Sequence, residues 1–232
     1  MNIENKKTVG MIIAMDKEIQ PFLNEFGTPL EETEHCGFPV KKYSVYGVKV
    51  CVIKSGVGEI HAAAATAILI SVFGCEIILN FGVVGALSKD LSVLDTVFLK
   101  GVVHYDFDLS AVDGTPAGVY PDENDAVIAV KNDAFFKIAA DFSDIPSVIC
   151  ASGDKFIENK DIKSRLNEEY GASVCDMESA GILLICKNAG VPVIFVKAVS
   201  DGEGGADEFT RRVKAALEAY ISVAIKILRG LN

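Results

Sequence analysis

The chain has 232 residues, of which 50% are hydrophobic and 23% charged, so it carries enough apolar material to bury one sizeable core. Its formal net charge of −10 argues against a nucleic-acid partner, because binding to a phosphate backbone needs clustered Lys and Arg. Its longest apolar stretch, residues 62–74, is too short to cross a bilayer, so we also expect no membrane partner.

Brief runs rich in Val and Ile, each bounded by Gly, Pro or charge, alternate with longer helical patterns. In chain order we expect strand 8–15, helix 16–26, strands 37–47 and 48–56, helix 58–73, strands 75–82, 94–108 and 147–153, helices 158–169 and 177–190, strand 191–201 and helix 206–229. This alternation is typical of a mostly parallel sheet with both faces covered. The sequence therefore predicts an α/β protein, a three-layer α/β/α single domain over residues 1–232 with a mixed central β-sheet.

Two of these segments differ from the others in pattern. Residues 37–47, "GFPVKKYSVYG", and residues 94–108, "LDTVFLKGVVHYDFD", alternate or are β-branched, so we expect them to add antiparallel strands. The polar stretch 113–125 indicates an excursion from the sheet rather than a domain boundary.

Six cysteines, none of them in a Cys-x-x-Cys pair, stand mostly inside apolar runs. They indicate buried reduced thiols of a cytoplasmic protein rather than a disulfide framework or a zinc site. The three histidines, His35, His61 and His104, show no metal-binding spacing, and we expect no metal or organic cofactor. Residues 1–7 precede only a short apolar run with acidic residues after it, so no cleavable signal is expected.

Polar or glycine-rich turns stand at the ends of four predicted strands. Residues 16–18 follow the first, residues 82–85 end another, Asp154 and Phe156 follow a third, and Asp201 ends the last. The carboxyl ends of parallel strands meet at one edge of a sheet, and ligand sites form there. We therefore expect these residues to gather at one rim.

Three acidic residues of that rim, Glu18, Glu178 and Asp201, are candidate site residues. Each alone also fits a structural role, as an acid in a first helical turn or as a turn residue. Together they suit cleavage of a glycosidic bond, which uses a protonated acid at the leaving group, a carboxylate that polarises water and a carboxylate that binds a sugar diol.

Other site chemistries receive less support. The glycine turn "NFGVVGAL", residues 80–87, matches neither G-x-x-x-x-G-K-[ST] nor G-x-G-x-x-G, and no Arg lies near it. No G-x-S-x-G elbow supports a Ser-His-Asp triad. The sequence thus favours neither a phosphate cradle nor acyl transfer.

Six stretches in order, "GMIIAMDKEI", "KSGVGEIHAA", "EIILNFGVVGAL", "SGDKFI", "CDMESAG" and "VKAVSDG", resemble the nucleoside phosphorylase and nucleosidase superfamily. Among its members the chain looks most like the 5'-methylthioadenosine/S-adenosylhomocysteine nucleosidases, and the resemblance covers essentially the whole chain. It implies a phosphorylase/hydrolase-like fold and an enzyme of nucleoside catabolism, for instance in methionine salvage. The implied reaction releases adenine from 5'-methylthioadenosine, S-adenosylhomocysteine or related 5'-modified adenosines by hydrolysing the N-glycosidic bond.

The resemblance also implies the catalytic roles. Glu18 matches the acid that activates the attacking water, and Asp201 matches the acid that protonates N7 of the adenine. Ser200 stands where it can orient Asp201, and Gly85 lies in the matching turn beside the ribose. Protonation of N7 makes the base a better leaving group, so Asp201 should hold its proton near neutral pH in a partly dry site.

Five further residues match the family's substrate-binding positions. Glu178 matches the residue that binds the ribose, with Met177 beneath the sugar. Phe156 matches the aromatic residue that stacks on the base, and the main chain of Ile157 matches the position that reads the adenine edge. Val57 matches a wall of the pocket for the 5' substituent.

Departures from the family pattern leave two alternatives open. A phosphate-dependent phosphorylase is the first, although Asn80 and Val83 stand where phosphorylases of this superfamily carry a phosphate-binding Arg and Ser. A nucleoside-binding module without turnover is the second, because Val83 and Lys197 replace the Ser and Arg of the nucleosidases. Ala206 replaces an aromatic residue that commonly covers the 5' pocket.

The resemblance finally implies a homodimer as well as a small-molecule nucleoside substrate. In such a dimer a neighbour's loop, from about His104 to Pro116, closes the 5' pocket. The aromatic sequence "HYDFD" is suited to that contact.

Overall fold

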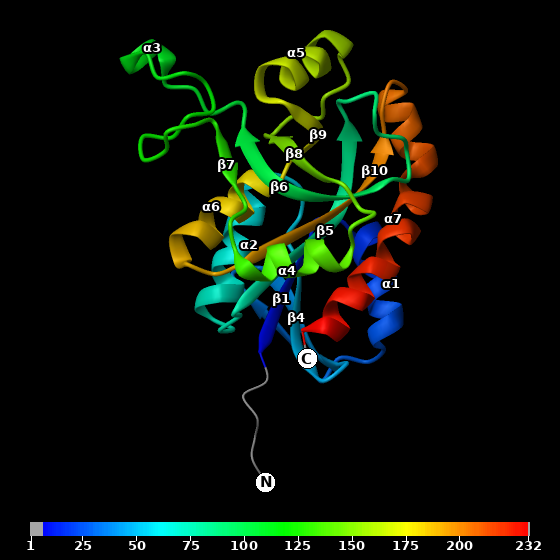
Figure 1. Cartoon of the computed structure of the whole chain (residues 1–232). Helices are drawn as coiled ribbons and strands as arrows, with labels where there is room; N and C mark the ends of the chain where they lie inside the picture. Colours follow the sequence, from blue (N-terminus) through cyan, green and yellow to red (C-terminus); the bar gives the residue numbers. More distant parts are fainter. Residues whose placement is uncertain (1–6, 232) are drawn as a thin grey trace.

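The computed structural model describes residues 7–231 and shows one mixed sheet with helices on both of its faces (Figure 1). The strands are β1 (Thr8–Ile13), β2 (Glu31–His35), β3 (Phe38–Val45), β4 (Val48–Lys54), β5 (Ile77–Ala86), β6 (Thr96–His104), β7 (Val127–Ala129), β8 (Ser147–Ser152), β9 (Ala172–Asp176) and β10 (Val193–Asp201). The helices are α1 (Asp16–Phe26), α2 (Glu59–Ser71), α3 (Ser110–Asp113), α4 (Asp133–Asp141), α5 (Lys160–Tyr170), α6 (Ser179–Ala189) and α7 (Gly205–Gly230).

The strand order is β10-β6-β8-β9-β5-β1-β4-β3-β2, with β7 paired to β6. β10 also pairs with β5, so the sheet closes on itself through β6, β8 and β9. β1, β5 and β10 run parallel, whereas β9 meets β5 antiparallel through the pair Gly85 and Cys175 near the carboxyl ends of both strands. The carboxyl ends of β1, β5, β9 and β10 therefore meet at one place, which is where a site is expected in such a sheet.

The helices cover the two faces in pairs. α1 packs against α7 on one face, where α7 also contacts β5 and β10, and α2 packs against α6 on the other face (Figure 1). The predicted three-layer architecture is thus confirmed. α3 belongs to a segment between β6 and β7 that extends away from the sheet, and this segment contains the whole polar stretch 113–125.

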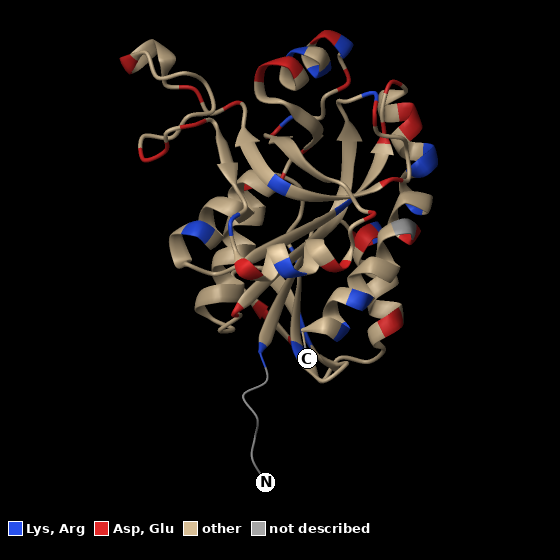
Figure 2. Cartoon of the chain, in the orientation of Figure 1, with Lys and Arg blue, Asp and Glu red and all other residues tan. Residues whose placement is uncertain are grey.

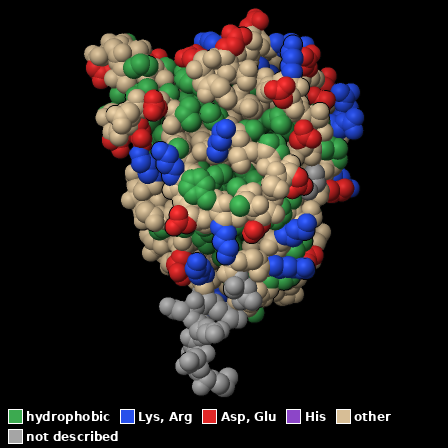
Figure 3. Space-filling view, viewed as in Figure 1, with side chains coloured by type: hydrophobic (Ala, Val, Ile, Leu, Met, Phe, Trp, Pro, Cys, Tyr) green, Lys and Arg blue, Asp and Glu red, His purple; other side chains and the backbone are tan. Residues whose placement is uncertain are grey.

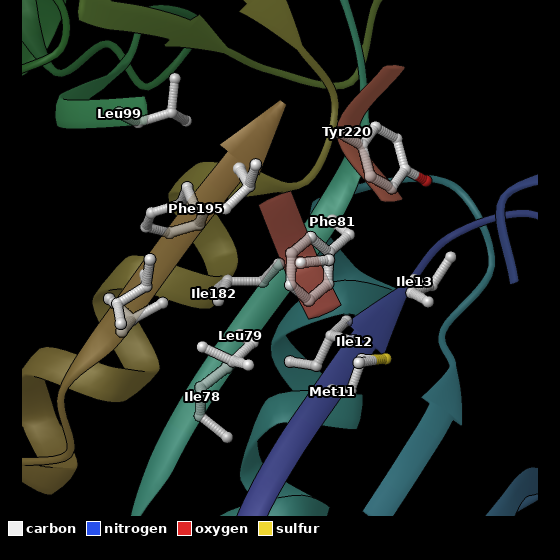
Figure 4. Packing of buried hydrophobic residues seen from close by; sticks show 14 of the residues in the cluster. Met11, Ile12, Ile13, Ile78, Leu79, Phe81, Leu99, Ile182, Phe195 and Tyr220 are labelled. Carbon is white, nitrogen blue, oxygen red and sulfur yellow. The ribbon is translucent and has the colours of Figure 1, made fainter. Parts of the chain in front are cut away.

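The hydrophobic core lies between the sheet and these helices (Figure 4). β10 is buried at every position, and Phe81 of β5 packs between Phe22 and Tyr220, with ring centroids 5.0 and 6.0 Å away. Burial of such rings is a large part of what stabilises the fold, because each removes an extended apolar area from water. The core thereby fixes the strand ends that carry the site.

Charged residues lie mainly on the helices and on the connecting segments, while most of the sheet is uncharged (Figure 2). On the face shown in Figure 3, hydrophobic side chains are exposed in small patches between charged ones. Among the described residues, no helix is both long enough and apolar enough to cross a membrane.

Most predicted elements are confirmed, with bounds shifted by a few residues, but some features were missed. Residues 94–108 contain β6, which is antiparallel to β10 and β7 as expected and also pairs in parallel with β8, which was not foreseen. β2, β7, β9, α3 and α4 were not predicted. Helix 177–190 begins only at Ser179, because β9 delivers Asp176 and the chain turns through residues 177–178. The prediction of no cleavable signal rests partly on residues 1–6, which lie outside the described range.

Candidate active site

A cavity of about 180 Å³ lies where β1, β5, β9 and β10 end. The three predicted carboxyl residues, Glu18, Glu178 and Asp201, all line it. Glu18 lies in the first turn of α1 directly after β1, Glu178 lies between β9 and α6, and Asp201 is the last residue of β10. The sheet topology therefore brings together carboxyls that are far apart in the sequence.

The walls of the cavity contain most of the other predicted site residues. Val57, Gly85, Phe156 and Met177 all line it, as does Ser200. Val57 and Phe156 are half exposed at its mouth, and each shows 48% of its surface.

Ile157 is the exception among the predicted residues. It does not line the cavity and is buried next to it, in an apolar cluster with Leu166. Its predicted role involves the main chain rather than the side chain, and it stays a prediction.

Glu18 is held by the backbone. Its Oε1 accepts a hydrogen bond from the Val83 amide at 3.0 Å, and its Oε2 accepts one from the Met15 amide at 2.9 Å. In the second bond Glu18, the third residue of α1, accepts from the backbone amide of the residue that caps the helix, so the local sequence fixes this side chain. Burial raises the pKa of Glu18 to about 6, against the opposing charge of Lys197.

Glu178 is oriented by the start of α2. Its Oε1 accepts a hydrogen bond from the Gly58 amide at 3.1 Å. Gly58 has a φ of +105°, a conformation that favours glycine, and this turn aims the amide at the carboxyl. Burial, followed by the nearby charge of Asp176, raises the pKa of Glu178 to about 7.

Asp201 is buried at the end of β10. The Ser200 hydroxyl lies 2.9 Å from its Oδ1, and the Lys163 Nζ lies 3.5 Å from its Oδ2. Burial raises the pKa of Asp201 although Lys163 opposes the shift. A side chain at Gly85 would come within 3.2 Å of Oδ2, so glycine there keeps space around the carboxyl.

A buried ion pair borders the cavity, which Asp176 also lines. Lys197 Nζ is 2.9 Å from Asp176 Oδ2, and both side chains are almost completely buried. Burial alone would raise the pKa of Asp176, but Lys197 and the hydroxyls of Ser152 and Ser179 hold it below its ordinary value. Burial would lower the pKa of Lys197, but Asp176 and Glu178 outweigh it and raise that pKa.

Several residues of this site were missed or misjudged in the sequence. Asp176 was noticed beside Glu178 but given no role, and Lys163 was not identified. Lys197 was noted only as a departure from the family, while a lysine inside an otherwise apolar strand could have signalled a buried partner. Phe209 also lines the cavity from α7 and packs edge-on against Phe156 at 6.0 Å, so an aromatic ring is present although Ala206 is not one.

No metal centre accompanies the carboxyls in the described part of the chain. Within residues 7–231, no three His, Cys, Asp or Glu side chains form a group that could hold a metal ion. His104 instead bonds the Tyr120 hydroxyl at 2.7 Å and lies 3.0 Å from Asp106. The carboxyls of the site can transfer protons and stabilise charge: burial raises the pKa of Glu18 to about 6 and also raises the pKa of Asp201.

Comparison with known proteins gives a consistent family match. A family model described as the phosphorylase superfamily matches residues 8–231. The aminodeoxyfutalosine nucleosidase of Helicobacter pylori strain ATCC 700392 / 26695 is 30% identical over 228 residues, which are 96% of each chain. A 5'-methylthioadenosine/S-adenosylhomocysteine nucleosidase of Oceanobacillus iheyensis is also 30% identical, over 95% of this chain and all of that one.

Solved structures share the architecture. A 5'-methylthioadenosine/S-adenosylhomocysteine nucleosidase from Helicobacter pylori, crystallised with butyl-thio-DADMe-Immucillin-A, superimposes with a TM-score of 0.87. It is 30% identical, and the match covers 98% of both chains.

Proposed function

This chain belongs to the phosphorylase superfamily, and on that premise we propose that it is an N-ribosyl hydrolase that releases adenine from 5'-modified adenosines. The observation that carries the proposal is the meeting of Glu18, Glu178 and Asp201 at one mainly apolar cavity. The names of its relatives support the same reaction, since they are nucleosidases.

In the proposed reaction a water molecule attacks C1' of the ribose, and Glu18 accepts the proton that this water loses. The bond between C1' and N9 breaks, its electron pair passes into the purine, and Asp201 supplies a proton to N7. The products are adenine and the 5'-modified ribose. Glu178 binds the ribose hydroxyls, and its negative charge stabilises the cationic character of the sugar in the transition state.

The protonation states support these roles. Glu18, with a pKa of about 6, is a carboxylate at neutral pH yet remains basic enough to accept a proton. Burial raises the pKa of Asp201 above its ordinary value, which favours its proposed role as the proton donor to the base. Ser200 orients it from one side.

Water suits this site better than phosphate as the nucleophile. A phosphate dianion needs cationic, bidentate partners. The buried cation nearest Glu18 is Lys197, which is already paired with Asp176. Val83 offers only its backbone amide, which is occupied by Glu18.

The 5' substituent faces an apolar mouth in this proposal. Val57 and Phe209 line that side of the cavity, so a thioether or another weakly polar group fits it. The relatives' names include both methylthioadenosine and aminodeoxyfutalosine activities, and we propose that 5'-methylthioadenosine, S-adenosylhomocysteine and aminofutalosine-type nucleosides all belong to the candidate substrates. Methionine salvage is the metabolic setting that the first of these suggests.

The test is an assay of adenine release in phosphate-free buffer, with 5'-methylthioadenosine, S-adenosylhomocysteine, an aminofutalosine and inosine compared in parallel. We expect free adenine and a reducing sugar from at least one of the 5'-modified adenosines, and little turnover of inosine. Strict phosphate dependence with formation of a ribose 1-phosphate would make the protein a phosphorylase. Binding without any adenine release would make it a nucleoside-binding module.

We further propose that the enzyme is a cytoplasmic homodimer. The segment 104–116 extends from the body with Val112 81% exposed, and Val57 is exposed at the cavity mouth, so a second copy has apolar surface to cover. Five of the six cysteines are buried and all are free, as suits a reducing compartment. Sedimentation should give twice the mass of one chain, and a monomer at micromolar concentration would contradict the dimer.

A further inference from the structure

Glu59, the first residue of α2, lies outside the cavity lining yet connects several elements of the site. Its side chain is buried, with 6% of the residue exposed. Its Oε2 accepts a hydrogen bond from the Gly181 amide of α6 at 2.5 Å, and its Oε1 lies 2.5 Å from the Ser152 hydroxyl at the end of β8. A side chain at Gly181 would come within 2.6 Å of the Glu59 carbonyl, so the two helices meet closely here.

The hydrogen bonds around Ser152 require an extra proton. Its hydroxyl oxygen lies 2.5 Å from Glu59 Oε1 and 2.6 Å from Asp176 Oδ1, and it also accepts from the Ala180 amide at 3.1 Å. A serine hydroxyl has one hydrogen to donate and two lone pairs. It can donate to only one of the two carboxyls, so the other must carry its own proton and donate to Ser152.

The proton belongs to Glu59 rather than to Asp176. Asp176 Oδ2 faces the Lys197 ammonium and the Ser179 hydroxyl, and its Oδ1 also accepts from the Ser179 amide at 3.3 Å. A carboxylate surrounded by donors is stabilised in its charged form. Glu59 Oε1 has no such donor besides Ser152 among the contacts of the described residues.

The groups that face Glu59 favour the neutral form too. Asp176 and Glu178 lie on the α6 side, and Asp154, whose Oδ1 accepts from the Glu59 amide at 2.8 Å, follows β8. Tyr105 and Tyr120 face it from the segment after β6. Burial, followed by the charge of Asp176, raises the pKa of Glu59 to about 8.

We propose that Glu59 is a protonated positioning residue. Its carboxyl proton is donated to the Ser152 hydroxyl, which in turn donates to Asp176, and this chain of hydrogen bonds fixes the start of α2 against the site. The Gly58 amide, one residue earlier, holds Glu178, so displacement of α2 would misplace the ribose-binding carboxyl. Loss of the proton would place two carboxylates on one hydroxyl and repel them. The role in turnover rests on the proposed hydrolysis, whereas the protonation state does not.

The test compares Glu59→Gln with Glu59→Ala. Glutamine places an amide donor group and a carbonyl acceptor where a protonated glutamate has its hydroxyl and carbonyl, so Glu59→Gln should keep kcat/KM at neutral pH within about threefold of wild type. Glu59→Ala should lower kcat/KM about a hundredfold, mainly by raising KM, because Glu178 loses its fixed position. A smaller folded fraction alone would lower the apparent kcat and leave KM unchanged.

Thermal unfolding across pH gives a readout that does not depend on activity. The Glu59 pKa is raised from 4.5 to about 8, so folding takes up a proton between these values and the stability contribution of this group falls as pH rises through them. The unfolding midpoint of Glu59→Gln minus that of wild type should therefore increase from pH 5 to pH 8. Below the lower of the two pKa values this difference should no longer change with pH. The exposed Glu168→Gln serves as the control and should show no such trend.

Two results would overturn the proposal. One is a Glu59→Gln variant that is as inactive as Glu59→Ala, which would mean that the charge is required. The other is a difference in unfolding midpoint that stays constant with pH. If wild type releases no adenine but the midpoint difference still grows with pH, the proposed hydrolysis fails while the protonated Glu59 stands.

Discussion

Two buried pairs of aspartate and lysine flank the same cavity, and their geometries differ. Lys197 Nζ lies 2.9 Å from Asp176, whose oxygens also receive hydrogen bonds from two serine hydroxyls. Lys163 Nζ lies 3.5 Å from Asp201 and donates instead to the Gly202 carbonyl at 2.7 Å. Lys197 is bound directly to its aspartate, whereas Lys163 is held mainly by a backbone carbonyl.

The difference teaches that neighbours, rather than residue type, decide whether the pKa of a buried aspartate falls or rises. The pKa of Asp176 lies below its ordinary value because donors surround it, while burial raises the pKa of Asp201. Asp176 is therefore a fixed negative charge of the scaffold, and Asp201 is suited to donate a proton. Asparagine substitutions separate the two roles.

The largest expected effect is on turnover in Asp201→Asn. Asparagine keeps the shape but cannot supply an acidic proton, so kcat should fall by about 10²–10⁴-fold. Binding of an unreactive substrate analogue, measured by calorimetry, should change little, and the exposed Asp207→Asn should behave as wild type. Unchanged turnover in Asp201→Asn would contradict the assignment of Asp201 as the proton donor.

The next largest effect is on folding, in Asp176→Asn. This change leaves Lys197 buried without its carboxylate, so the free energy of unfolding should fall by about 3–5 kcal/mol. Asp201→Asn leaves Lys163 with its hydrogen bond to the Gly202 carbonyl, so it should lower the free energy of unfolding by only about 1 kcal/mol. Urea unfolding of the two variants at neutral pH measures the contrast.

The matched control for that contrast removes both charges of the pair. In Asp176→Asn combined with Lys197→Met no buried charge is left unpaired, so part of the lost stability should return. Equal destabilisation by Asp176→Asn and Asp201→Asn would contradict the difference between the two ion pairs.

A smaller effect is expected from Lys163→Met. Without this ammonium the pKa of Asp201 should rise further, so the alkaline decline in kcat/KM should move up by about one pH unit. Turnover at neutral pH should fall by about tenfold, because no cation offsets the charge left on Asp201 after proton transfer. Lys160→Met, which removes an exposed lysine of the same helix, should shift neither quantity. If the alkaline decline in kcat/KM stays at the same pH in Lys163→Met, Lys163 does not act on Asp201.

The sequence predicted the elements whose signal is local. Strands such as β1 and β10 are apolar runs with sharp ends, and α7 has an amphipathic period, so pattern alone identifies them. β2, "EETEH", escaped because it is a polar edge strand with no apolar alternation. β9 escaped because it has only five residues and lies directly between two helices.

The residues of the site also divide into those with a local sequence signal and those without one. Glu18 follows a predicted strand, Asp201 ends another and Glu178 stands at the start of a predicted helix. All three match family motifs, and the structure places them at one cavity. Asp176, Lys163 and Glu59 could not be named from pattern, because their importance depends on which polar atoms meet them in the folded chain. Their assignment requires the hydrogen-bond geometry.

The pH dependence of kcat/KM for 5'-methylthioadenosine in phosphate-free buffer tests the account most directly. Glu18 and Glu178 must both be ionised, so kcat/KM should rise through the interval set by their pKa values of about 6 and about 7. It should fall again at higher pH as Asp201 loses its proton. A profile that is flat over the range in which the protein stays folded would contradict the assignment of Glu18 as base and Asp201 as acid.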